Sequence, residues 1–327
     1  MQNSVQFKVV KYNPSFFKEW NNFIASAKNA TFLFHRDFIE YHQDRFKDYS
    51  LLVFKNTKLV AVLPANVNAS TLYSHQGLTY GAFVVSPDTK MEAYLASFKA
   101  VLQYLNEQGI TTLNLKIIPN IYNRLPSDEI DYLMFVTQAQ LLKRETLSVV
   151  DYRNEITISK NRKEGVKKAN THNLIIKEET NFDAFWNAIL IPNLQEKYQT
   201  KPVHSLNEIN LLKSRFPNNI KQFNVYNENE IVAGATIFES KYVAHTQYIS
   251  ANTNKNTLGS LDFLHAHLLN AFAHKRYFDF GTSNQNNGKQ INYGLQFWKE
   301  GFGAKIIIQD LYSINTANVK LLNGVLI

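Results

Sequence analysis

The stretch that decides the fold reads Tyr277-Phe-Asp-Phe-Gly281, then a polar loop, then Gly294-Leu-Gln-Phe-Trp-Lys-Glu-Gly-Phe-Gly-Ala304. The first run predicts a short apolar strand that ends at a glycine. The loop 282–290 is made of Thr, Ser, Asn, Gln, Gly and Lys, so it has no apolar side chain to anchor it in a core. The second run predicts an aromatic, lysine-bearing turn. Because polar loops between rigid elements often carry binding and catalysis, this region is the first candidate for a functional site.

Composition limits the classes of protein to which the chain can belong. The 327 residues include no cysteine, which excludes disulfides, thiolate nucleophiles and cysteine-ligated zinc and agrees with a reducing compartment. The sequence has no signal-peptide pattern and no run of about 18 apolar residues, so we expect a cytoplasmic protein without a membrane span. A net charge of +8 favours phosphorylated partners such as nucleotides, nucleic acid or anionic lipid. The alternative is that this charge only keeps the protein soluble.

The same order of predicted elements occurs twice along the chain. The first half shows a strand at 6–11, a helix from Pro14, a helix at 35–46, strands at 49–54 and 58–67, an amphipathic helix at 88–106 and a strand at 111–117. The second half shows a strand at 174–177, helices at 182–198 and 205–216, strands at 220–226, 231–238 and 242–249, a helix at 260–274 and a strand at 277–280. This repetition predicts two domains of similar topology, covering residues 1–150 and 151–327.

A basic segment joins the two halves. Five cations crowd residues 160–168 against a single acid, Glu164: they are Lys160, Arg162, Lys163, Lys167 and Lys168. If the segment is helical, Lys160, Lys163 and Lys167 share one face. Such a face could bind a chain of phosphates, or it could be a helix surface that only contacts water.

Five motifs together carry a resemblance to a known family. They are Arg162-Lys-x-x-x-Lys-Lys168, Tyr248-Ile-Ser-Ala251, Gly259-Ser260, Asp279-Phe-Gly281 and Gly294-Leu-x-x-Trp-Lys-Glu-Gly-Phe-Gly303. The chain resembles the FemAB-like branch of the GNAT superfamily, which includes bacterial peptidoglycan aminoacyltransferases and envelope-locus acyltransferases. The resemblance is strongest over residues 150–310, and the first half matches by element order and by the loop Ser74-His-Gln-Gly-Leu-Thr-Tyr-Gly81. It implies an α+β (α/β) fold of two tandem GNAT-like domains, each a mixed sheet flanked by helices.

The resemblance also implies where a donor binds. In this family the strand meander splays from the strand after the helix, and the pantetheine arm of an acyl carrier lies in the gap. Acyl-CoA is therefore the expected co-substrate, with no tightly bound cofactor, and a turn at a helix N-terminus would offer N–H groups to its phosphates. The turn residues are Asn256, Leu258, Gly259 and Ser260. The usual loop begins with Arg or Gln and ends with Gly or Ala, whereas Asn256 and Leu261 stand there in this chain. Gly259-Ser260 could instead be a simple helix N-cap.

Acyl transfer to an amine needs a base for the amine proton and donors for the tetrahedral oxyanion. The candidate bases are His245 and Tyr248 on the third meander strand and Asp279 at the end of the strand after the helix. Strict alternation along a strand places His245 and Tyr248 on opposite faces of the sheet. A lone strand histidine more often only packs, and Asp279 could equally cap the following loop.

The resemblance assigns a role to Lys299 as well. This residue aligns with a lysine of the family's Gly-Leu-x-x-Phe-Lys motif, which implies a position near the acceptor's phosphate or the acyl donor. It could also be a surface lysine beside Glu300. The remaining expected substrate contacts are Arg162, Lys163, Lys167 and Tyr293. No metal site is predicted, because His265 and His267 are two residues apart on a helix and point in nearly opposite directions.

Three functions remain open at this point. The first is an acyltransferase that acts on an amine of a cell-envelope sugar or peptide precursor, small or lipid-linked, with peripheral membrane contact. The second is an aminoacyl-tRNA-dependent transferase of the peptidoglycan kind, so tRNA is a candidate partner and DNA is not. The third is a binding protein that keeps the fold without catalysis. No metalloprotease, α/β-hydrolase or P-loop motif occurs in the sequence, which argues against those chemistries.

Overall fold

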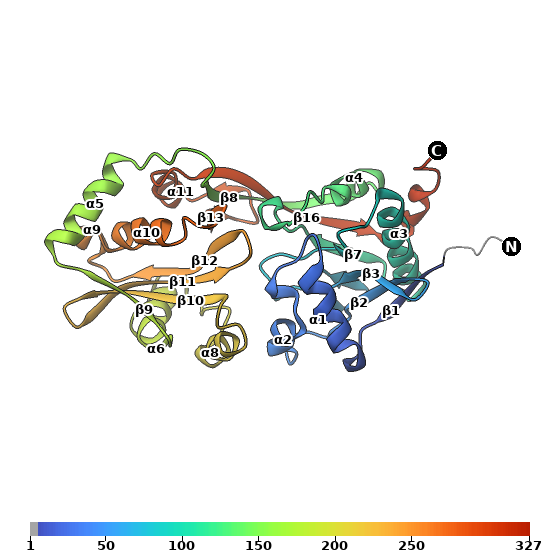
Figure 1. Ribbon diagram of the computed structural model, residues 1–327, viewed down its shortest axis with the longest axis horizontal. Coiled ribbons are helices and arrows are strands. Elements are labelled where there is room, and N and C mark those ends of the chain that lie inside the picture. Colours follow the sequence, from blue (N-terminus) through green and yellow to red (C-terminus); the bar gives the residue numbers. More distant parts are fainter. Residues whose placement is uncertain (1–5) are drawn as a thin grey trace. The chain divides into compact units, whose positions relative to one another are not determined.

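The computed structural model describes residues 6–327, and the chain forms two compact units (Figure 1). Unit 1 contains the chain up to Arg144 together with Ile308–Ile327, and unit 2 contains Glu145–Ile307. This division differs from the expected one, 1–150 and 151–327, chiefly in the last segment of the chain. Residues 308–327 belong to unit 1 because strand β16 (Lys305–Asn315) pairs antiparallel with β7 (Thr112–Lys116).

Unit 1 is built from two small groups of strands and the helices that pack on them. One sheet is antiparallel in the order β1-β2-β3-β6, and in the other β4, β5, β7 and β16 are successive neighbours. The elements are β1 (Phe7–Lys11), α1 (Phe17–Ser26), α2 (Arg36–Ile39), β2 (Leu51–Lys55), β3 (Lys58–Leu63), β4 (Asn66–Asn68), β5 (Thr71–Tyr73), β6 (Val84–Val85), α3 (Met91–Glu107) and α4 (Glu129–Val136).

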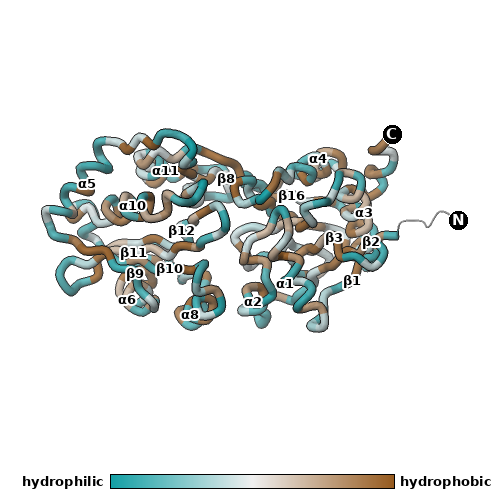
Figure 2. The backbone as a smooth tube through the Cα atoms, in the orientation of Figure 1, coloured by the Kyte–Doolittle hydropathy of each residue, from teal (hydrophilic) through white to brown (hydrophobic). Residues whose placement is uncertain are grey.

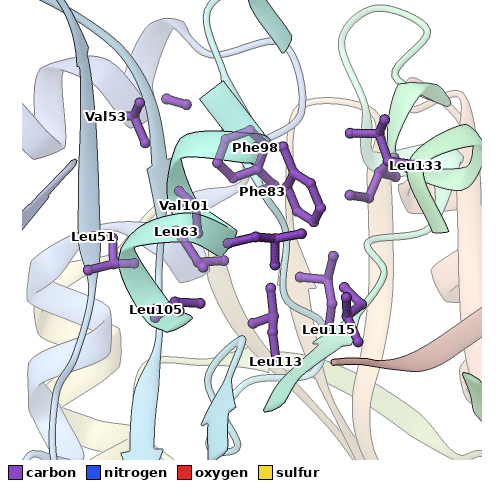
Figure 3. Packing of buried hydrophobic residues seen from close by; sticks show 14 of the residues in the cluster. Leu51, Val53, Leu63, Phe83, Phe98, Val101, Leu105, Leu113, Leu115 and Leu133 are labelled. Atoms are coloured by element: carbon purple, nitrogen blue, oxygen red, sulfur yellow. The ribbon is translucent and has the colours of Figure 1, made fainter. Parts of the chain in front are cut away.

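The core of unit 1 confirms the amphipathic helix expected at 88–106. Helix α3 buries one continuous apolar face, whose members Tyr94, Phe98, Val101, Leu102 and Leu105 are each 0% exposed. Figure 3 shows the ring of Phe98 beside that of Phe83, and the two centroids are 5.4 Å apart. Because burying a large apolar side chain stabilises a fold by about 1.5–3 kcal/mol, this face binds the helix firmly to its sheet.

Two expected elements of unit 1 are shorter than the sequence predicted. The helix expected at 35–46 is only α2 and a 3₁₀ turn (Glu40–His42). The buried side chains of this segment, Arg36, Phe38, Ile39 and His42, do not lie on one face, as those of a long amphipathic helix would. The strand expected at 58–67 stops after Leu63, because Pro64 has no N–H for the sheet, and resumes as β4.

Unit 2 contains one sheet in the order β8-β13-β12-β11-β10-β9, with helices on both faces. Figure 1 shows α5 and α10 over one face and α6 and α8 over the other. Strand β11 is buried from Ile231 to Phe238 and is accordingly a mostly apolar strand in Figure 2. The elements are β8 (Gln140–Asp151, entering the unit at Glu145), α5 (Lys160–Thr171), β9 (Ile175–Glu179), α6 (Asp183–Phe185), α7 (Ile191–Tyr198), α8 (Leu206–Arg215), β10 (Ile220–Asn227), β11 (Glu230–Glu239), β12 (Val243–Ala251), α9 (Lys255–Leu258), α10 (Ser260–Ala271), β13 (Tyr277–Thr282) and α11 (Tyr293–Glu300). This order confirms the elements expected in the second half.

The decisive stretch 277–304 differs from its expected form in two places. The turn expected over 294–304 is mostly helix α11, capped by Asn292, whose Oδ1 accepts the N–H of Leu295 at 3.0 Å. The polar loop contains a short hairpin, β14 (Asn284–Gln285) with β15 (Gln290–Ile291). Asn284 anchors it, since its Oδ1 accepts hydrogen bonds from the N–H and the hydroxyl of Thr146, both at 2.7 Å. A polar side chain therefore fixes this loop without an apolar core.

Candidate active site

Strands β12 and β13 bring a histidine and a buried aspartate together. The strands pair in parallel over only three positions, at the last of which His245 lies opposite Asp279. His245 Nδ1 is 3.0 Å from Asp279 Oδ2, and the Asp279 side chain is 1% exposed. Because the carboxylate accepts the Nδ1 proton, the neutral imidazole presents Nε2 as a proton acceptor. Two of the three candidate bases thus form one hydrogen-bonded pair.

Gly281 connects this pair to Lys299. The Gly281 N–H donates to Asp279 Oδ1 at 2.7 Å, and the Gly281 carbonyl accepts from Lys299 Nζ at 2.9 Å. The residue has φ +72°, and a Cβ placed on it would lie 3.4 Å from His245 Cε1, so a glycine suits both the backbone and the histidine ring. The backbone of one residue therefore binds two of the three side chains, and it leaves room for the third.

Lys299 is a buried cation and not the surface lysine that the sequence left as an alternative. Its residue is 3% exposed, and Nζ donates to the carbonyls of Gly281 and Thr282 at 2.9 and 2.7 Å. Burial lowers the pKa of Lys299 to about 8, while the negative charge of Asp279 acts in the opposite direction. The lysine therefore carries a charge at neutral pH in a place where water screens it poorly.

A β-bulge in β12 changes which face Tyr248 occupies. Ile237 pairs with Thr246 and Thr236 pairs with Tyr248, so Gln247 is the extra residue in the ladder. The expected strict alternation is therefore wrong after Thr246, and Tyr248 lies on the same face of the sheet as His245. The sequence around Gln247 contains no glycine or proline that would have indicated the bulge.

Tyr248 is held by a histidine that the sequence pattern did not indicate. The Tyr248 hydroxyl lies 2.6 Å from His204 Nδ1 and also accepts the His204 N–H at 3.2 Å. Burial raises the pKa of Tyr248 to about 12, so the phenol is protonated at neutral pH. Tyr248 is a weaker candidate for the base than His245.

A pocket of about 810 Å³ lies beside the end of β12 in the same unit. Its walls come from α5, α7, the end of β12, the turn 255–262 and α11. Of the candidate site residues, Arg162, Asn256 and Gly259 line it, whereas His245, Asp279 and Lys299 do not. Strand β12 connects the two places, because Ile249, Ser250 and Ala251 form one wall. A pocket of this size accepts a cofactor-sized ligand.

The turn at the start of α10 is covered on one side by α5. A Cβ on Gly259 would overlap the carbonyl oxygen of Gly165, and a Cβ on Gly165 would overlap the Asp262 carboxylate. Lys168 Nζ also donates to the Asn256 carbonyl at 3.1 Å. Two glycines thus let α5 pack directly on the turn that the resemblance assigns to the donor's phosphates. Of the other turn residues, Leu258 and Ser260 are buried.

The basic join forms most of helix α5. Arg162 Nη1 binds Asp262 Oδ1 at 2.6 Å, and Trp298 Nε1 donates to the same oxygen at 2.8 Å. Burial raises the pKa of Asp262, and its partners Trp298 and Arg162 act against that rise. Lys167 pairs with Glu164 at 2.8 Å on the exposed face of α5.

The remaining expected substrate contacts lie outside the pocket. Lys163 and Lys167 are exposed on α5 and do not line it. Tyr293 is 79% exposed and stacks on Phe297, with ring centroids 6.0 Å apart. Within residues 6–327 there is no cluster of three or more His, Cys, Asp or Glu side chains able to hold a metal ion. Over the same range, no helix combines the length and apolar character needed to cross a membrane.

Comparison with known proteins places this geometry in a recognised fold. No protein-family model matches the sequence, and no curated protein matches it either. Solved structures do match: that of FemX gives a TM-score of 0.67 at 10% identity, over 97% of this chain and 99% of that chain. The C-terminal domain of a putative lysylphosphatidylglycerol synthetase from Agrobacterium fabrum gives 0.60 at 12% identity over 95% of both chains. A tandem GNAT protein from the clavulanic acid biosynthesis pathway gives 0.53 at 11% identity, over 95% of this chain and 99% of that chain.

The chain has a tandem GNAT-like fold. The agreement extends over nearly the whole chain, so the expected α+β fold class and the FemAB-like resemblance are confirmed at the level of the fold. At these identities the likeness concerns the fold alone, and an activity has to be argued from the residues of the site.

Proposed function

We propose that the protein is an acyltransferase that transfers an acyl group from acyl-CoA to an amine of a cell-envelope sugar or peptide precursor. The observation that carries this proposal is the His245–Asp279 pair beside the buried Lys299, at the point where β12 and β13 stop pairing. The acceptor would be a small or lipid-linked molecule, met in the cytoplasm or at the membrane surface. The fold shared with FemX and with a tandem GNAT protein supports the same reaction class.

The chemistry assigns one task to each member of the site. The amine must lose a proton as its nitrogen attacks the acyl carbonyl and the C–N bond forms. His245 Nε2 accepts that proton, and Asp279 stabilises the imidazolium. The Lys299 ammonium stabilises the oxyanion of the tetrahedral intermediate. The C–S bond then breaks, and the departing thiolate takes the proton from His245.

A second candidate is transfer of an aminoacyl group from aminoacyl-tRNA. It is favoured by Leu261, which lines the pocket where a coenzyme A loop carries a small residue, and by the packing of α5 on Gly259. In that reaction the same residues would act, but the bond that breaks is the C–O ester bond of the tRNA.

Two measurements separate these candidates. Native mass spectrometry of freshly purified protein should show retained coenzyme A for the first candidate and retained tRNA for the second. Thiol release from acyl-CoA in the presence of amino sugars or peptides should then depend on His245, with His245→Gln inactive and a surface variant, Lys241→Ala, unchanged. If neither donor is retained and none is turned over, the protein is the non-catalytic binding protein.

A further inference from the structure

In the described part of the chain, two lysines that line the pocket of unit 2 have neither a hydrogen-bond acceptor nor an ion-pair partner. The cationic lining residues are Arg162, Lys168, Lys197 and Lys255, and the acidic ones are Glu164 and Asp262. Most of these charges have partners: Arg162 binds Asp262, Lys168 binds a backbone carbonyl, and Glu164 binds Lys167. Within residues 6–327, the ammonium groups of Lys197 and Lys255 make no hydrogen bond or ion pair. These two lysines, together with Lys168, whose carbonyl partner is uncharged, therefore carry the surplus positive charge of the pocket.

The two lysines also affect each other. Burial lowers the pKa of Lys255, and the positive charge of Lys197 lowers it further. Like charges held near each other, without an acid to neutralise them, destabilise a site until an anion binds. Lys197 comes from α7 and Lys255 from α9, so two separate elements direct cations to one place.

The wall that carries Lys197 is fixed to the sheet. Asn193 Nδ2 donates to Ser250 Oγ at 2.8 Å and to the Ala251 carbonyl at 2.6 Å, which ties α7 to the end of β12. The pocket also has apolar lining residues, among them Leu261, Leu295 and Trp298, which together are called the apolar wall here. A ligand that matches the pocket carries both anionic groups and an uncharged arm.

We propose that Lys197 and Lys255 form a phosphate subsite that binds the phosphates of a small diphosphate-bearing donor, while its uncharged arm lies along the apolar wall. The proposal rests on the proposed function, because it takes the donor to be phosphorylated. It differs from that function's expected phosphate site, since α5 packs on Gly259 at the start of α10. The phosphates are thus held by the side chains of Lys197 and Lys255 and not by the backbone N–H groups of the turn 256–260.

The test measures binding of coenzyme A and of pantetheine, which lacks the phosphates, to the full chain by calorimetry. Replacing both lysines (Lys197→Ala with Lys255→Ala) should weaken coenzyme A binding at least about tenfold, equal to about 1.4 kcal/mol. Pantetheine binding should not change, and the wild-type preference for coenzyme A should shrink as salt increases. The double Lys→Arg variant should keep the affinity.

A matched control removes two lysines outside the pocket. Lys201 and Lys241 are exposed residues of the same unit, so Lys201→Ala with Lys241→Ala has the same net charge as the test variant. Coenzyme A bound equally by wild type and by the Lys197/Lys255 variant would overturn the subsite and leave the proposed function intact. If the test and control variants lose the same affinity for coenzyme A, the loss comes from net charge alone, and this result would also overturn the subsite.

Two other outcomes would also overturn the subsite. If the wild type binds an aminoacyl-tRNA but neither coenzyme A nor pantetheine, the small-ligand subsite and the acyl-CoA part of the proposed function both fail. If coenzyme A and pantetheine lose affinity together in the double variant, the lysines shape the pocket and do not bind phosphate.

Discussion

Each unit buries a charged cluster, and the two clusters differ in how completely their members are paired. In unit 1 the Arg36 guanidinium donates from its three nitrogens to Glu40, Asp48 and Ser50, at 3.0, 2.7 and 3.1 Å. The ring of Tyr12 lies 3.7 Å from the same guanidinium. In unit 2, Asp279 and Lys299 are just as buried, at 1% and 3% exposed. Within residues 6–327, however, His245 Nε2 makes no hydrogen bond, and Lys299 uses two acceptors for three N–H groups.

The difference separates a cluster that holds a fold from one that can act on another molecule. A buried charge whose nitrogens each bind an acceptor within the protein has little left to offer a ligand, and removing it mainly destabilises the protein. A cluster that keeps one acceptor and one donor open can accept a proton and stabilise an anion. The following substitutions and the pH dependence test this difference between the two clusters.

The largest effect is expected from Asp279→Asn. The amide cannot hold His245 in the tautomer with Nε2 as acceptor, so kcat of acyl transfer should fall by about 10²- to 10⁴-fold. Initial rates with saturating donor measure this, and circular dichroism checks that the variant is folded. Activity above about a tenth of wild type would mean that the unit 2 cluster is structural, as the unit 1 cluster is.

The next effect is on stability and concerns Arg36→Met. Removing one partner of a buried ion pair typically costs about 3–5 kcal/mol, and we expect the lower end because the partner side chains of Glu40 and Asp48 are 33% and 31% exposed. Urea denaturation measures the loss, and kcat of the folded fraction should not change.

The control for this prediction is another arginine of unit 1. Arg144 pairs with Asp310 at 2.7 Å, but its side chain is 52% exposed, so Arg144→Met should cost about 1 kcal/mol or less. Equal losses from the two variants would show that the Arg36 cluster is no more important to stability than a surface pair.

A smaller effect is expected from pH. Since burial lowers the pKa of Lys299 to about 8, kcat should decline as the pH rises through about 8 and the lysine loses its charge. The stability changes in the opposite direction. The unfolded chain, with an ordinary lysine pKa of 10.5, binds more protons than the folded chain between the two values, so the free energy of unfolding should rise from about pH 8 to 10.5.

Lys299→Met is the reference for both pH profiles. This variant should lose about 10²-fold in kcat and should lack the rise in stability above pH 8 that the wild type shows. If the stability of Lys299→Met depends on pH in the same way as that of the wild type, Lys299 does not titrate in this range.

The smallest effect is expected from Tyr248→Phe. The substitution removes one hydroxyl that is hydrogen-bonded to His204, so it should cost about 1 kcal/mol of stability and change kcat by less than about threefold. Parallel thermal and kinetic measurements test this. A loss of kcat as large as that of Asp279→Asn would return Tyr248 to the role of base.

Most elements of unit 2 from β9 to β13 could be predicted because their apolar periods and turn residues agree with the final packing. Helix α4 could not, since Tyr132 and Phe135 are 46% and 80% exposed and the segment shows no one-sided apolar stripe. The last strand could not be assigned to unit 1, because its pairing with β7 joins residues far apart in the chain.

The candidate site was predicted as a set of residue types but not as an arrangement. His245 and Asp279 are 34 positions apart, and their contact depends on a strand register that no local pattern encodes. The bulge at Gln247 adds one residue to a strand whose composition gives no sign of it. The basic join was visible, yet the partner that neutralises Arg162 lies 100 positions away.

Gly281 gives this site a built-in spectroscopic reporter. Its N–H binds the carboxylate that orients His245, its carbonyl binds the ammonium of Lys299, and a Cβ placed on it would lie 3.4 Å from the imidazole. A change in protonation at any of the three groups alters the electronic environment of a single peptide unit. The amide resonance of Gly281 in a heteronuclear NMR spectrum should therefore follow the charge state of the whole cluster, without a substrate, an assay or a label on any of the reacting side chains.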